Sequence, residues 1–337
     1  MIITRTPFRI SFAGGGSDLE TYYRQEPGLV LSTAINKYIY LTVMNRFGNN
    51  FRISYSRTEL VDTVDQIEHN IVRESLKLLA VRRGLEIVSM ADIPAQSGLG
   101  SSSSFTVGLL HALYAAQGQL ASPERLAREA SELEIETLKE PIGKQDQYIA
   151  AYGGMQLIQF NPDGSVFVDP VVCSAATYNE LNRRLVMFFT GITRNARDIL
   201  SRQSSEIEPK RPVLRKMCGI ARQLREVLTS GKDLNAFGEL LHQAWEAKRS
   251  LESSISSSQI DDYYNRAIRA GALGGKLLGA GGGGFLLFFC EPHLQENLRA
   301  ELAELVHVPF QFERQGSKIV YVSDDSPPPD FAGRRDL

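Results

Sequence analysis

The sequence predicts an α+β protein made of two domains, on three observations. The chain has 337 residues, which is long enough for two domains that share an interface. Its composition changes near residue 175, where strand-like segments give way to long helical ones. Beyond that point, helices and strands follow in the order of an α+β sandwich. We therefore expect domains at 1–175 and 176–325, followed by a flexible tail at 326–337.

The first domain is expected to begin with strands. Residues 2–13 mix β-branched and aromatic residues with polar ones and run into three glycines, which predicts a strand that enters a tight turn. Residues 66–83 carry apolar side chains at helical spacing and precede Gly84, which predicts a helix and its end. Further strands are predicted at 29–46, 51–55, 85–90, 155–160 and 165–172.

Three more helices are predicted in this domain. Residues 101–116 are rich in Leu, Ala and Val, which predicts a mostly buried helix directly after a loop at 94–100. A Ser-Pro pair at the start of 122–138 supplies an N-cap and a first-turn proline, so a second helix is expected there. A shorter third helix is expected at 144–151.

The second domain mixes the two kinds of element. A strand is predicted at 184–190, and a nearly continuous helical pattern covers 195–254. The remaining elements are expected to be a helix at 259–270, a glycine-rich segment, a strand at 285–290, a helix at 292–305 and strands at 308–313 and 318–322. The tail from Asp325 holds three consecutive prolines and is expected to be disordered.

The composition excludes several classes of function. The net charge is −2 and the sequence pI is near 6.3, so the chain lacks the diffuse basic surface that nucleic-acid binding usually needs. The longest apolar runs have only strand length, so no membrane span is expected, and the N-terminus has no apolar stretch of signal-peptide length. The three cysteines are far apart and are expected to be reduced thiols. These observations predict a cytoplasmic protein.

The segment PAQSGLGSSSS lies between a predicted strand and a predicted helix, where a phosphate-binding loop has to lie. Gly98 and Gly100 let the backbone approach an anion, and the N-terminus of the following helix favours negative charge. The hydroxyls of Ser101, Ser102 and Ser103 add donors to phosphate oxygens and an oxygen ligand for Mg²⁺. The alternative is a flexible serine-rich linker, but a linker does not normally adjoin a long apolar helix.

Two better-known nucleotide patterns do not fit the chain. The P-loop pattern GxxxxGK[ST] occurs nowhere in the sequence. Residues 279–284 formally match GxGxxG, but the strand-like FLLFFC follows them in place of the helix that a dinucleotide site requires. On its pattern alone, this glycine segment fits a close-packed turn without a ligand equally well.

Three segments in this order resemble the motifs of the GHMP kinase superfamily, which includes galactokinase, homoserine kinase and mevalonate kinase. They are TPFRISFAGGGSD, PAQSGLGSSSS and LLGAGGGGFLL, the last of which holds Gly281, Gly282 and Gly283 in a loop that would close the site from the second domain. The resemblance implies an N-terminal mixed α/β nucleotide-binding domain and a C-terminal ferredoxin-like α+β domain. It also implies ATP as the phosphoryl donor and Mg²⁺ as the cofactor.

The resemblance also implies catalytic residues. GKQDQY is similar to the GIMDQ segment in which galactokinase-like enzymes carry their catalytic aspartate, which gives Asp146 that role. Glu134, twelve positions earlier, matches the acidic residue that coordinates Mg²⁺, and Ser102 is expected to share the ion. Glu132 and Glu136 are interpreted as solvated residues on a helix face.

Arg9 stands where the first motif carries a basic residue. Because a guanidinium is permanently protonated, Arg9 cannot act as a base. It can instead pair with Asp146 and counter the charge on the transferred group. This favours Asp146 as an orienting group and weak base.

The acceptor is expected to bind at the first motif. Asp18 is kept there, but Gly15 and Gly16 stand where many members carry Glu and His, so the substrate is not galactose. FAGGGSD, GKQDQY and GITRNAR most resemble the kinases of D-glycero-D-manno-heptose 7-phosphate, with fucokinase-type enzymes as close cousins. This resemblance implies transfer to the anomeric hydroxyl, giving a 1,7-bisphosphate that feeds nucleotide-activated heptose synthesis for surface polysaccharide.

A phosphorylated sugar needs basic groups that galactokinase lacks. Arg194, in GITRNAR, is the candidate for holding the sugar phosphate. Lys37 and Lys144 are weaker candidates, because a single surface lysine is more often a solvated charge.

Three other interpretations stay open. The first is a kinase for an unphosphorylated sugar such as fucose. The second is a non-catalytic ligand sensor on the same fold, although the presence of Asp146, Glu134 and the serine run together argues against it. The third is a related ATP-dependent decarboxylase of isoprenoid acids, which the sugar-type QDQY segment does not suit. The sequence leaves the oligomeric state open, with a homodimer as one candidate.

Overall fold

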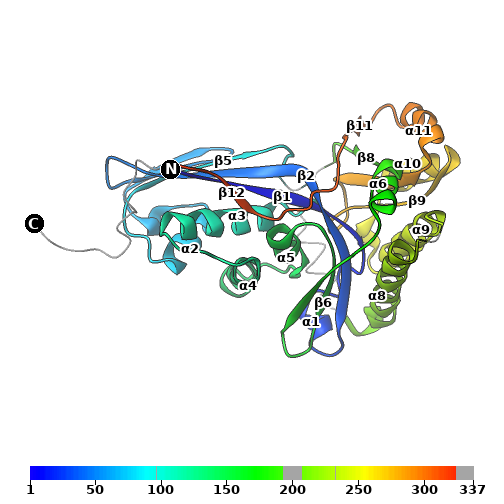
Figure 1. Cartoon of the computed structure of the whole chain (residues 1–337), viewed down its shortest axis with the longest axis horizontal. Helices are drawn as coiled ribbons and strands as arrows, with labels where there is room; N and C mark the ends of the chain where they lie inside the picture. The colour runs from blue at the N-terminus through cyan, green and yellow to red at the C-terminus, as the bar shows by residue number, and fades with distance from the viewer. Residues whose placement is uncertain (96, 193–206, 232, 324–337) are drawn as a thin grey trace, which may run out of the picture.

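Two long strands, β1 (Ile2–Ala13) and β2 (Gly28–Asn45), form the spine of a first sheet. The computed structural model describes residues 1–95, 97–192, 207–231 and 233–323. β1 and β2 pair antiparallel over most of their length, and Figure 1 shows them running along the whole sheet. The sheet also contains β3 (Phe51–Ser54), β4 (Thr58–Val61), β5 (Leu85–Ala91), β6 (Met155–Phe160), β7 (Val166–Pro170) and β12 (Lys318–Val322).

The length of β2 lets one strand serve two partners along the same edge. Its first half, residues 28–33, pairs with β6, and its second half, residues 39–45, pairs with β5. The strand order is β12-β1-β2-β5-β3-β4, with β6 and β7 joined to the first half of β2. β12 pairs with β1, so the end of the described chain returns to the first sheet.

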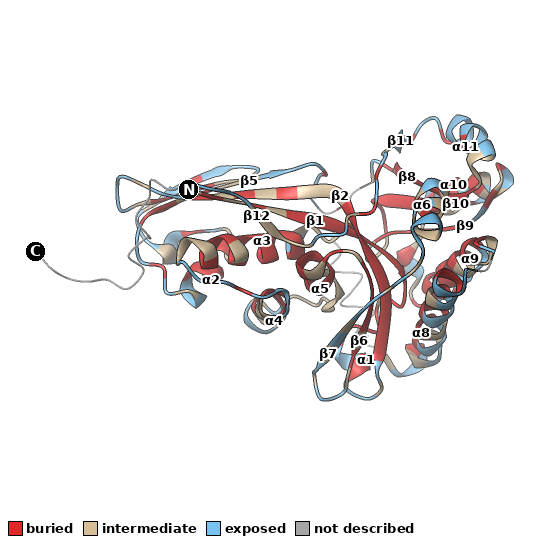
Figure 2. Cartoon of the chain, viewed as in Figure 1, coloured by how far each residue is buried: buried red, intermediate tan, exposed pale blue. Residues whose placement is uncertain are grey.

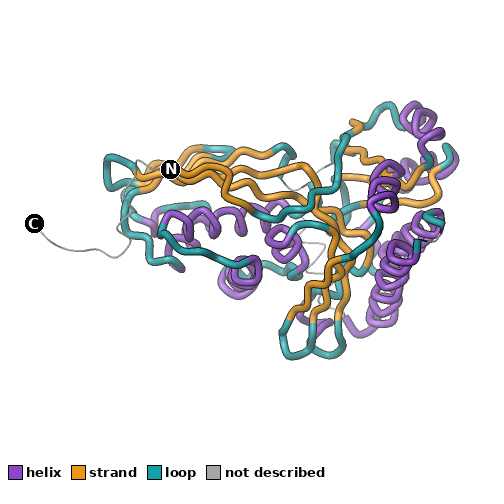
Figure 3. Tube along the Cα trace, viewed as in Figure 1, coloured by secondary structure: helices purple, strands orange, loops and turns teal. Residues whose placement is uncertain are grey.

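Helices gather on one face of this sheet, as Figure 3 shows, and a single short turn, α1 (Glu20–Tyr23), follows β1. They are α2 (Asn70–Leu78), α3 (Ser101–Ala116), α4 (Pro123–Ser131) and α5 (Gln145–Tyr152). α3 packs against β1, β2 and α5, and most of its residues are buried (Figure 2). Its bounds and its burial are those that the sequence predicts.

A π-helical turn, Glu132–Thr137, continues α4. The predicted cap at the other end is present: the Ser122 hydroxyl accepts the Arg125 N–H at 3.2 Å. Within the π-helical turn, Glu134 is fully buried. Glu136 is exposed and Glu132 forms an exposed ion pair with an arginine on α4, so their interpretation as solvated residues is confirmed.

The second sheet has the antiparallel order β11-β8-β10-β9. Its strands are β8 (Leu185–Phe189), β9 (Ala272–Leu277), β10 (Phe285–Cys290) and β11 (Val306–His307). The helices of this half are α6 (Ala175–Arg184), α8 (Ile207–Ser230), α9 (Asn235–Arg249), α10 (Ser258–Arg269) and α11 (Gln295–Glu301). Because the strand order is fourth, first, third, second, this half has the predicted ferredoxin-like arrangement.

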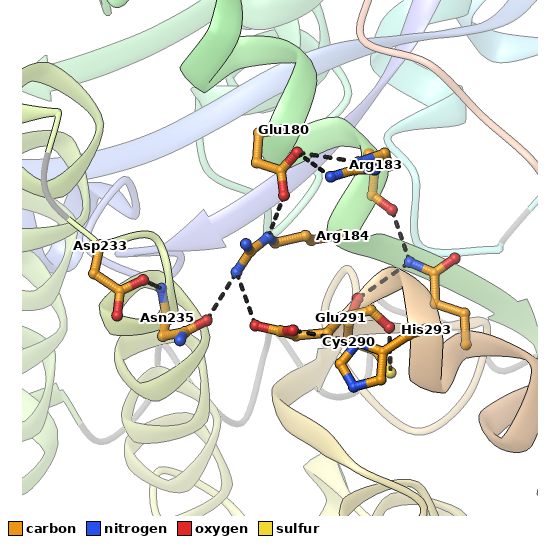
Figure 4. Close-up of polar contacts among 9 residues, drawn as sticks. Glu180, Arg183, Arg184, Asp233, Asn235, Cys290, Glu291 and His293 are labelled. Carbon is orange, nitrogen blue, oxygen red and sulfur yellow. Dashed lines mark hydrogen bonds and ion pairs between the residues drawn. The ribbon is translucent and has the colours of Figure 1, made fainter.

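Arg184, the last residue of α6, connects α6 with the start of α9 and the end of β10 (Figure 4). Its Nε donates to Glu180 Oε1 at 2.6 Å, and its Nη1 donates to Asn235 Oδ1 at 2.8 Å, at the start of α9. The same Nη1 lies 3.3 Å from Glu291 Oε1, directly after β10. Because the Arg184 side chain is 18% exposed, these bonds are shielded from water and hold α6 against the sheet.

Several element predictions need correction. The predicted helix 66–83 is only α2, because Val64–Gln66 forms a separate 3-10 turn closed by a capping box with Thr63, and Ala80 has a positive φ of 51°. The helix predicted at 292–305 divides into a 3-10 turn, Pro292–Leu294, and α11. The strand predicted at 308–313 is reduced to a single bridge between Phe312 and Ile35, and β11 precedes it.

The sequence does not predict α1, β4, α6 or β9. β9 falls in the expected glycine-rich segment, yet its glycines are needed where the strand packs on α9. A Cβ on Gly274 would lie 2.0 Å from the Gly238 carbonyl oxygen of that helix. The glycines of β9 therefore serve a contact between a helix and a strand that are far apart in the sequence.

The helical pattern at 195–254 corresponds to α8, α9 and a 3-10 turn, Ser253–Ile255, in its described part. The flexible tail predicted at 326–337 lies outside the described residues. The domains 1–175 and 176–325 remain a prediction. In the described ranges, no helix combines the length and apolarity needed to cross a lipid bilayer.

Candidate active site

A cleft of about 440 Å³ lies between the two halves of the molecule. Its walls come from the turn after β1, the loop before α3, the start of α5, helices α8 and α9, and the segment 279–284, which we call the glycine loop. These predicted site residues line it: Arg9, Gly15, Gly16, Asp18, Gly98, Gly100, Ser101, Ser102, Ser103, Glu134, Asp146, Gly281 and Gly283.

The other predicted site residues lie elsewhere. Gly282 belongs to the glycine loop, but it does not line the cleft, and its N–H donates to the Ile255 carbonyl at 2.9 Å. Arg194 lies outside the described residues. Lys37 and Lys144 are not among the described residues that line the cleft, and the Lys144 ammonium lies 5.1 Å from the ring centroid of Tyr23.

Gly100 sets the direction of the phosphate loop at the start of α3. It is the N-cap residue of that helix and has a left-handed φ of 79°, which glycine adopts without strain. A Cβ at this position would lie 3.1 Å from Asp146 Oδ2 and 3.3 Å from Arg9 Cγ. The lack of a side chain therefore brings the helix N-terminus against the Arg9–Asp146 pair, in a field that favours anions.

Asp146 and Arg9 form a bidentate ion pair at the centre of the cleft. Arg9 Nε and Nη2 donate to Asp146 Oδ1 and Oδ2, both at 2.7 Å. Arg9 Nη1 donates to the Gly98 carbonyl at 2.7 Å, so the guanidinium is fixed from two sides. The Arg9 side chain is 7% exposed and that of Asp146 is 21% exposed. The carboxylate thus has a fixed orientation and an open side toward the cleft.

Glu134 is placed beside the serine run. Ser102 Oγ donates to Glu134 Oε1 at 2.6 Å, and Gln147 Nε2 donates to Glu134 Oε2 at 2.7 Å. Burial raises the pKa of Glu134 to about 7, while hydrogen bonds from Ser102 and Gln147 act in the opposite direction. A carboxylate and a hydroxyl with adjoining oxygens are ligands that suit Mg²⁺.

These two residues fit a metal ion that is also held by phosphate. Among the described residues, no group of three or more His, Cys, Asp or Glu side chains can hold a metal ion by itself. Mg²⁺ commonly binds through one or two protein oxygens, with waters and substrate phosphates completing its shell. The pair Ser102 and Glu134 therefore fits Mg²⁺ that arrives with a nucleotide.

Asp18 is buried in the turn after β1, beside the start of α5, and is 3% exposed. Its Oδ1 accepts the Gly16 N–H at 2.8 Å, and its Oδ2 accepts the Gln145 N–H at 3.3 Å. Burial raises the pKa of Asp18, and both backbone bonds oppose this effect. A Cβ on Gly143 would lie 2.0 Å from Asp18 Oδ2, so glycine is required there for the carboxylate to face the cleft.

The phosphate loop and the glycine loop touch through their backbones. A Cβ on Gly279 would lie 2.5 Å from the Cα of Gly98, and a Cβ on Gly284 would lie 2.3 Å from the Ser97 carbonyl oxygen. Gly279 also has a left-handed φ of 73°. The two halves of the molecule thus meet at positions where side chains would separate them.

Two buried lysines complete the cleft, and the sequence reasoning did not identify them. Lys248 lies in the last turn of α9 and is 8% exposed, and Lys276 lies in β9 and is 3% exposed. Lys276 had a usable signal, since a charged residue stands within an apolar strand segment. Lys248 had none, because a lysine near a helix C-terminus is ordinary.

Comparison with known proteins agrees with this geometry. Residues 69–154 match the GHMP kinases N terminal domain, and residues 220–307 match the GHMP kinases C terminal family. The chain is 31% identical to the D-glycero-alpha-D-manno-heptose 7-phosphate kinase of Campylobacter jejuni, over 94% of this chain and 98% of that protein. The chain belongs to the GHMP kinases.

Solved structures of other GHMP kinases share the fold. A D-glycero-D-manno-heptose 1-phosphate kinase from Bacteroides thetaiotaomicron has a TM-score of 0.79 at 26% identity, over 96% of this chain and 100% of that one. A Streptococcus pneumoniae phosphomevalonate kinase has a TM-score of 0.77 over 93% of this chain and 100% of that one, and at 17% identity it shows the fold alone. This GHMP kinase is a sugar kinase, a phosphotransferase with an alcohol group as acceptor.

Proposed function

We propose that this GHMP kinase transfers the γ-phosphoryl group of ATP to the anomeric hydroxyl of D-glycero-D-manno-heptose 7-phosphate. The observation that carries the proposal is the Asp146 carboxylate, fixed by Arg9 beside the N-terminus of α3. The Campylobacter jejuni relative supports the choice of acceptor. The product, a 1,7-bisphosphate, would feed nucleotide-activated heptose synthesis for surface polysaccharide. The reaction uses cytoplasmic ATP, so we expect the enzyme in the cytoplasm, and a homodimer stays a prediction.

In the proposed step, the anomeric hydroxyl oxygen attacks the γ-phosphorus and forms a new P–O bond. The bond between the γ-phosphorus and the β,γ-bridging oxygen breaks, and its electron pair leaves with ADP. Asp146 orients the hydroxyl and accepts its proton, which then passes to water. Arg9 keeps the carboxylate in place and counters negative charge, because kinases act mainly by positioning and electrostatic stabilisation.

The phosphate side of the site would use the N-terminus of α3. Ser101, Ser102 and Ser103 line the cleft, and their hydroxyls and the helix N–H groups would donate to phosphate oxygens. Ser102 and Glu134 would hold Mg²⁺, which neutralises phosphate charge when bound. Because burial raises the pKa of Glu134 to about 7, cation binding would favour its charged form.

The acceptor side would use the turn after β1. Asp18 is a buried acceptor, and Gly15 leaves the space that a side chain would fill. The buried atoms Ser11 Oγ and Gln145 Oε1 have no hydrogen-bond partner among the described residues, and both residues line the cleft. Both oxygens are acceptors that the described part of the protein leaves unused beside the cleft.

The first test is a substrate panel. Purified protein is incubated with Mg²⁺-ATP and D-glycero-D-manno-heptose 7-phosphate, mannose, fucose, galactose or mevalonate, and ADP release is followed. Release with the heptose phosphate alone is the expected result. ADP release with fucose would mean that the acceptor is fucose, while the proposed phosphoryl transfer would stand. No release with any acceptor would overturn the proposal and favour a ligand sensor.

The catalytic assignment is tested by Asp146→Asn. We expect turnover to fall by about 10³-fold, since an amide does not accept the hydroxyl proton, while ATP affinity changes by less than about 3-fold. Asp262→Asn on α10 is the control, because that aspartate is 60% exposed and does not line the cleft. Near-normal turnover of Asp146→Asn would refute the assignment.

A further inference from the structure

Two buried lysines line the cleft and have no part in the step proposed above. Lys276 donates to the carbonyls of Ser11 at 2.7 Å and Phe12 at 2.9 Å, so its ammonium fastens the end of β1. Lys248 donates to the Gly279 carbonyl, and among the described residues this is the one acceptor within hydrogen-bond distance. An ammonium has three N–H donors, so Lys248 keeps two for a ligand in the cleft.

Lys248 lies at the contact between the phosphate loop and the glycine loop. Gly98 and Gly279 are in contact there, and the carbonyl of each accepts a hydrogen bond from a basic side chain. The Gly98 carbonyl accepts from Arg9, which belongs to the first half of the molecule. The Gly279 carbonyl accepts from Lys248, which belongs to the second half. The two cations are thus anchored on adjoining backbone positions, next to the loop that leads into α3.

Charged groups from four parts of the fold surround Lys248. Arg9 from β1, Asp18 from the turn after β1 and Asp146 from α5 all interact with the Lys248 ammonium. Lys276 faces it from β9, and α8 presents the uncharged Met217 on this side. Two other basic groups and two carboxylates thus lie around the Lys248 ammonium, and Glu134 and Glu140 also line the cleft. Arg9 and Lys248 are both anchored at the contact between the two loops, so a phosphoryl group bound there would meet two cations.

We propose that Lys248 binds a non-bridging oxygen of the γ-phosphoryl group from the glycine-loop side. The proposal rests on the proposed function and adds a catalytic residue from the second half of the molecule. Lys248 is anchored on the carbonyl of Gly279, the residue that meets Gly98 of the phosphate loop, whereas the acceptor pocket proposed above surrounds Asp18 and Gly15. This anchoring favours the γ-phosphoryl over the phosphate of the sugar.

The role in the reaction is electrostatic. While the bond to the β,γ-bridging oxygen breaks and the bond to the acceptor oxygen forms, Lys248 keeps its protons and stabilises charge on the equatorial oxygens. Such a donor, already in place, contributes mainly to the transition state. Removing it should lower kcat by about 10²-fold, with little change in the KM of the acceptor.

The deciding experiment measures equilibrium binding of two nucleotides by calorimetry in the presence of Mg²⁺. Wild type, Lys248→Met, Lys248→Arg and Lys210→Met are titrated with ADP and with the β,γ-imido analogue of ATP. Lys210→Met is the matched control, because Lys210 is also buried but does not line the cleft. Lys248→Met should bind the analogue about 10-fold more weakly and ADP within about 2-fold of wild type, and Lys248→Arg should recover part of the loss.

Two results would overturn the inference. One is an equal effect of Lys248→Met on both nucleotides, or no effect on either. The other is an unchanged affinity for the analogue together with a raised KM for the sugar phosphate, which would assign Lys248 to the acceptor. The binding result needs no acceptor, so a failure of the substrate panel would remove the proposed function while the selective loss of analogue binding still supported Lys248.

Discussion

Replacing Lys248 by methionine should make the protein more stable while it removes activity. Lys248 is a buried cation, and no ion pair within 4.0 Å compensates it among the described residues. Burial lowers its pKa from the ordinary 10.5 to about 8. A functional group kept in an unfavourable environment is expected to oppose stability. Methionine has a similar length and no charge, so it fits the same space.

The magnitude follows from the pKa. One pKa unit corresponds to about 1.4 kcal/mol, so the difference between 10.5 and about 8 corresponds to about 3 kcal/mol of destabilisation by the buried charge. Methionine also loses the hydrogen bond to the Gly279 carbonyl, which is worth about 1 kcal/mol. The net gain in the free energy of unfolding is about 2 kcal/mol, which raises Tm by about 3 °C for a chain of this size.

The sign of the effect depends on pH. Below pH 8, Lys248 is protonated in both the folded and the unfolded chain, so the folded wild type carries the full destabilisation. Between about pH 8 and 10.5, the folded state binds fewer protons than the unfolded state, and the destabilisation disappears as the pH rises. The gain from Lys248→Met should therefore be largest at pH 7 and smaller at pH 9.5.

The assay is calorimetric or fluorimetric thermal unfolding of wild type and Lys248→Met at pH 7 and pH 9.5, without nucleotide. Lys210→Met is again the control, because it removes an ammonium that lies 3.9 Å from the Glu252 carboxylate, and it should leave Tm unchanged or lower it. A lower Tm of Lys248→Met at pH 7, or a gain that does not depend on pH, would refute the reasoning.

Three further substitutions test other parts of the structure. Gly279→Ala should lower turnover about 10²-fold, because its Cβ would lie 2.5 Å from the Cα of Gly98. Gly118→Ala is the control and should retain turnover, because Gly118 has a similar left-handed φ of 70° but open space around it. Equal losses of turnover in the two variants would contradict this prediction. Glu134→Gln should raise the Mg²⁺ concentration for half-maximal turnover about 10-fold, and an unchanged Mg²⁺ dependence would remove it as a ligand. Arg184→Ala should lower the free energy of unfolding by about 2 kcal/mol in urea, and no change would show that its bonds contribute nothing.

The sequence predicts the first half of the fold well because its signals are local. α3 occupies 101–116 as expected, since an apolar run of helix length follows a glycine with a left-handed φ. The cap at Ser122 also acts within one turn of helix. Such features depend on residues that are close together in the chain, so the local sequence is enough to predict them.

Two of the elements that the sequence does not predict, β9 and α6, depend on contacts between distant segments. β9 contains Gly274 and Gly275, which weaken a strand by propensity, yet Gly274 lets β9 lie against Gly238 of α9. α6 has mixed composition and gains its position from Arg184, which reaches Asn235 and Glu291. A single sequence does not reveal either contact.

The candidate site divides in the same way. The resemblance to known motifs supplied Asp146, Glu134 and the phosphate loop, because these residues lie in recognisable segments. Lys248 lines the cleft because the end of α9 lies beside the glycine loop, where Lys248 donates to the Gly279 carbonyl, and no motif marks it. A charged residue that a distant helix contributes to the cleft, such as Lys248, is therefore identified from its burial and hydrogen bonds in the structure and not from a sequence motif.

The backbone contact between Gly98 and Gly279 positions the two basic side chains that face the cleft. Arg9 and Lys248 are each anchored to one of these two glycines, so the distance between the loops sets the distance between the cations. Separation of the loops would move Lys248 away from the phosphate while leaving Arg9 on Asp146. Glycine is then required at the contact for an electrostatic reason as well as a steric one, because any side chain there would weaken the charge that faces the transferred group.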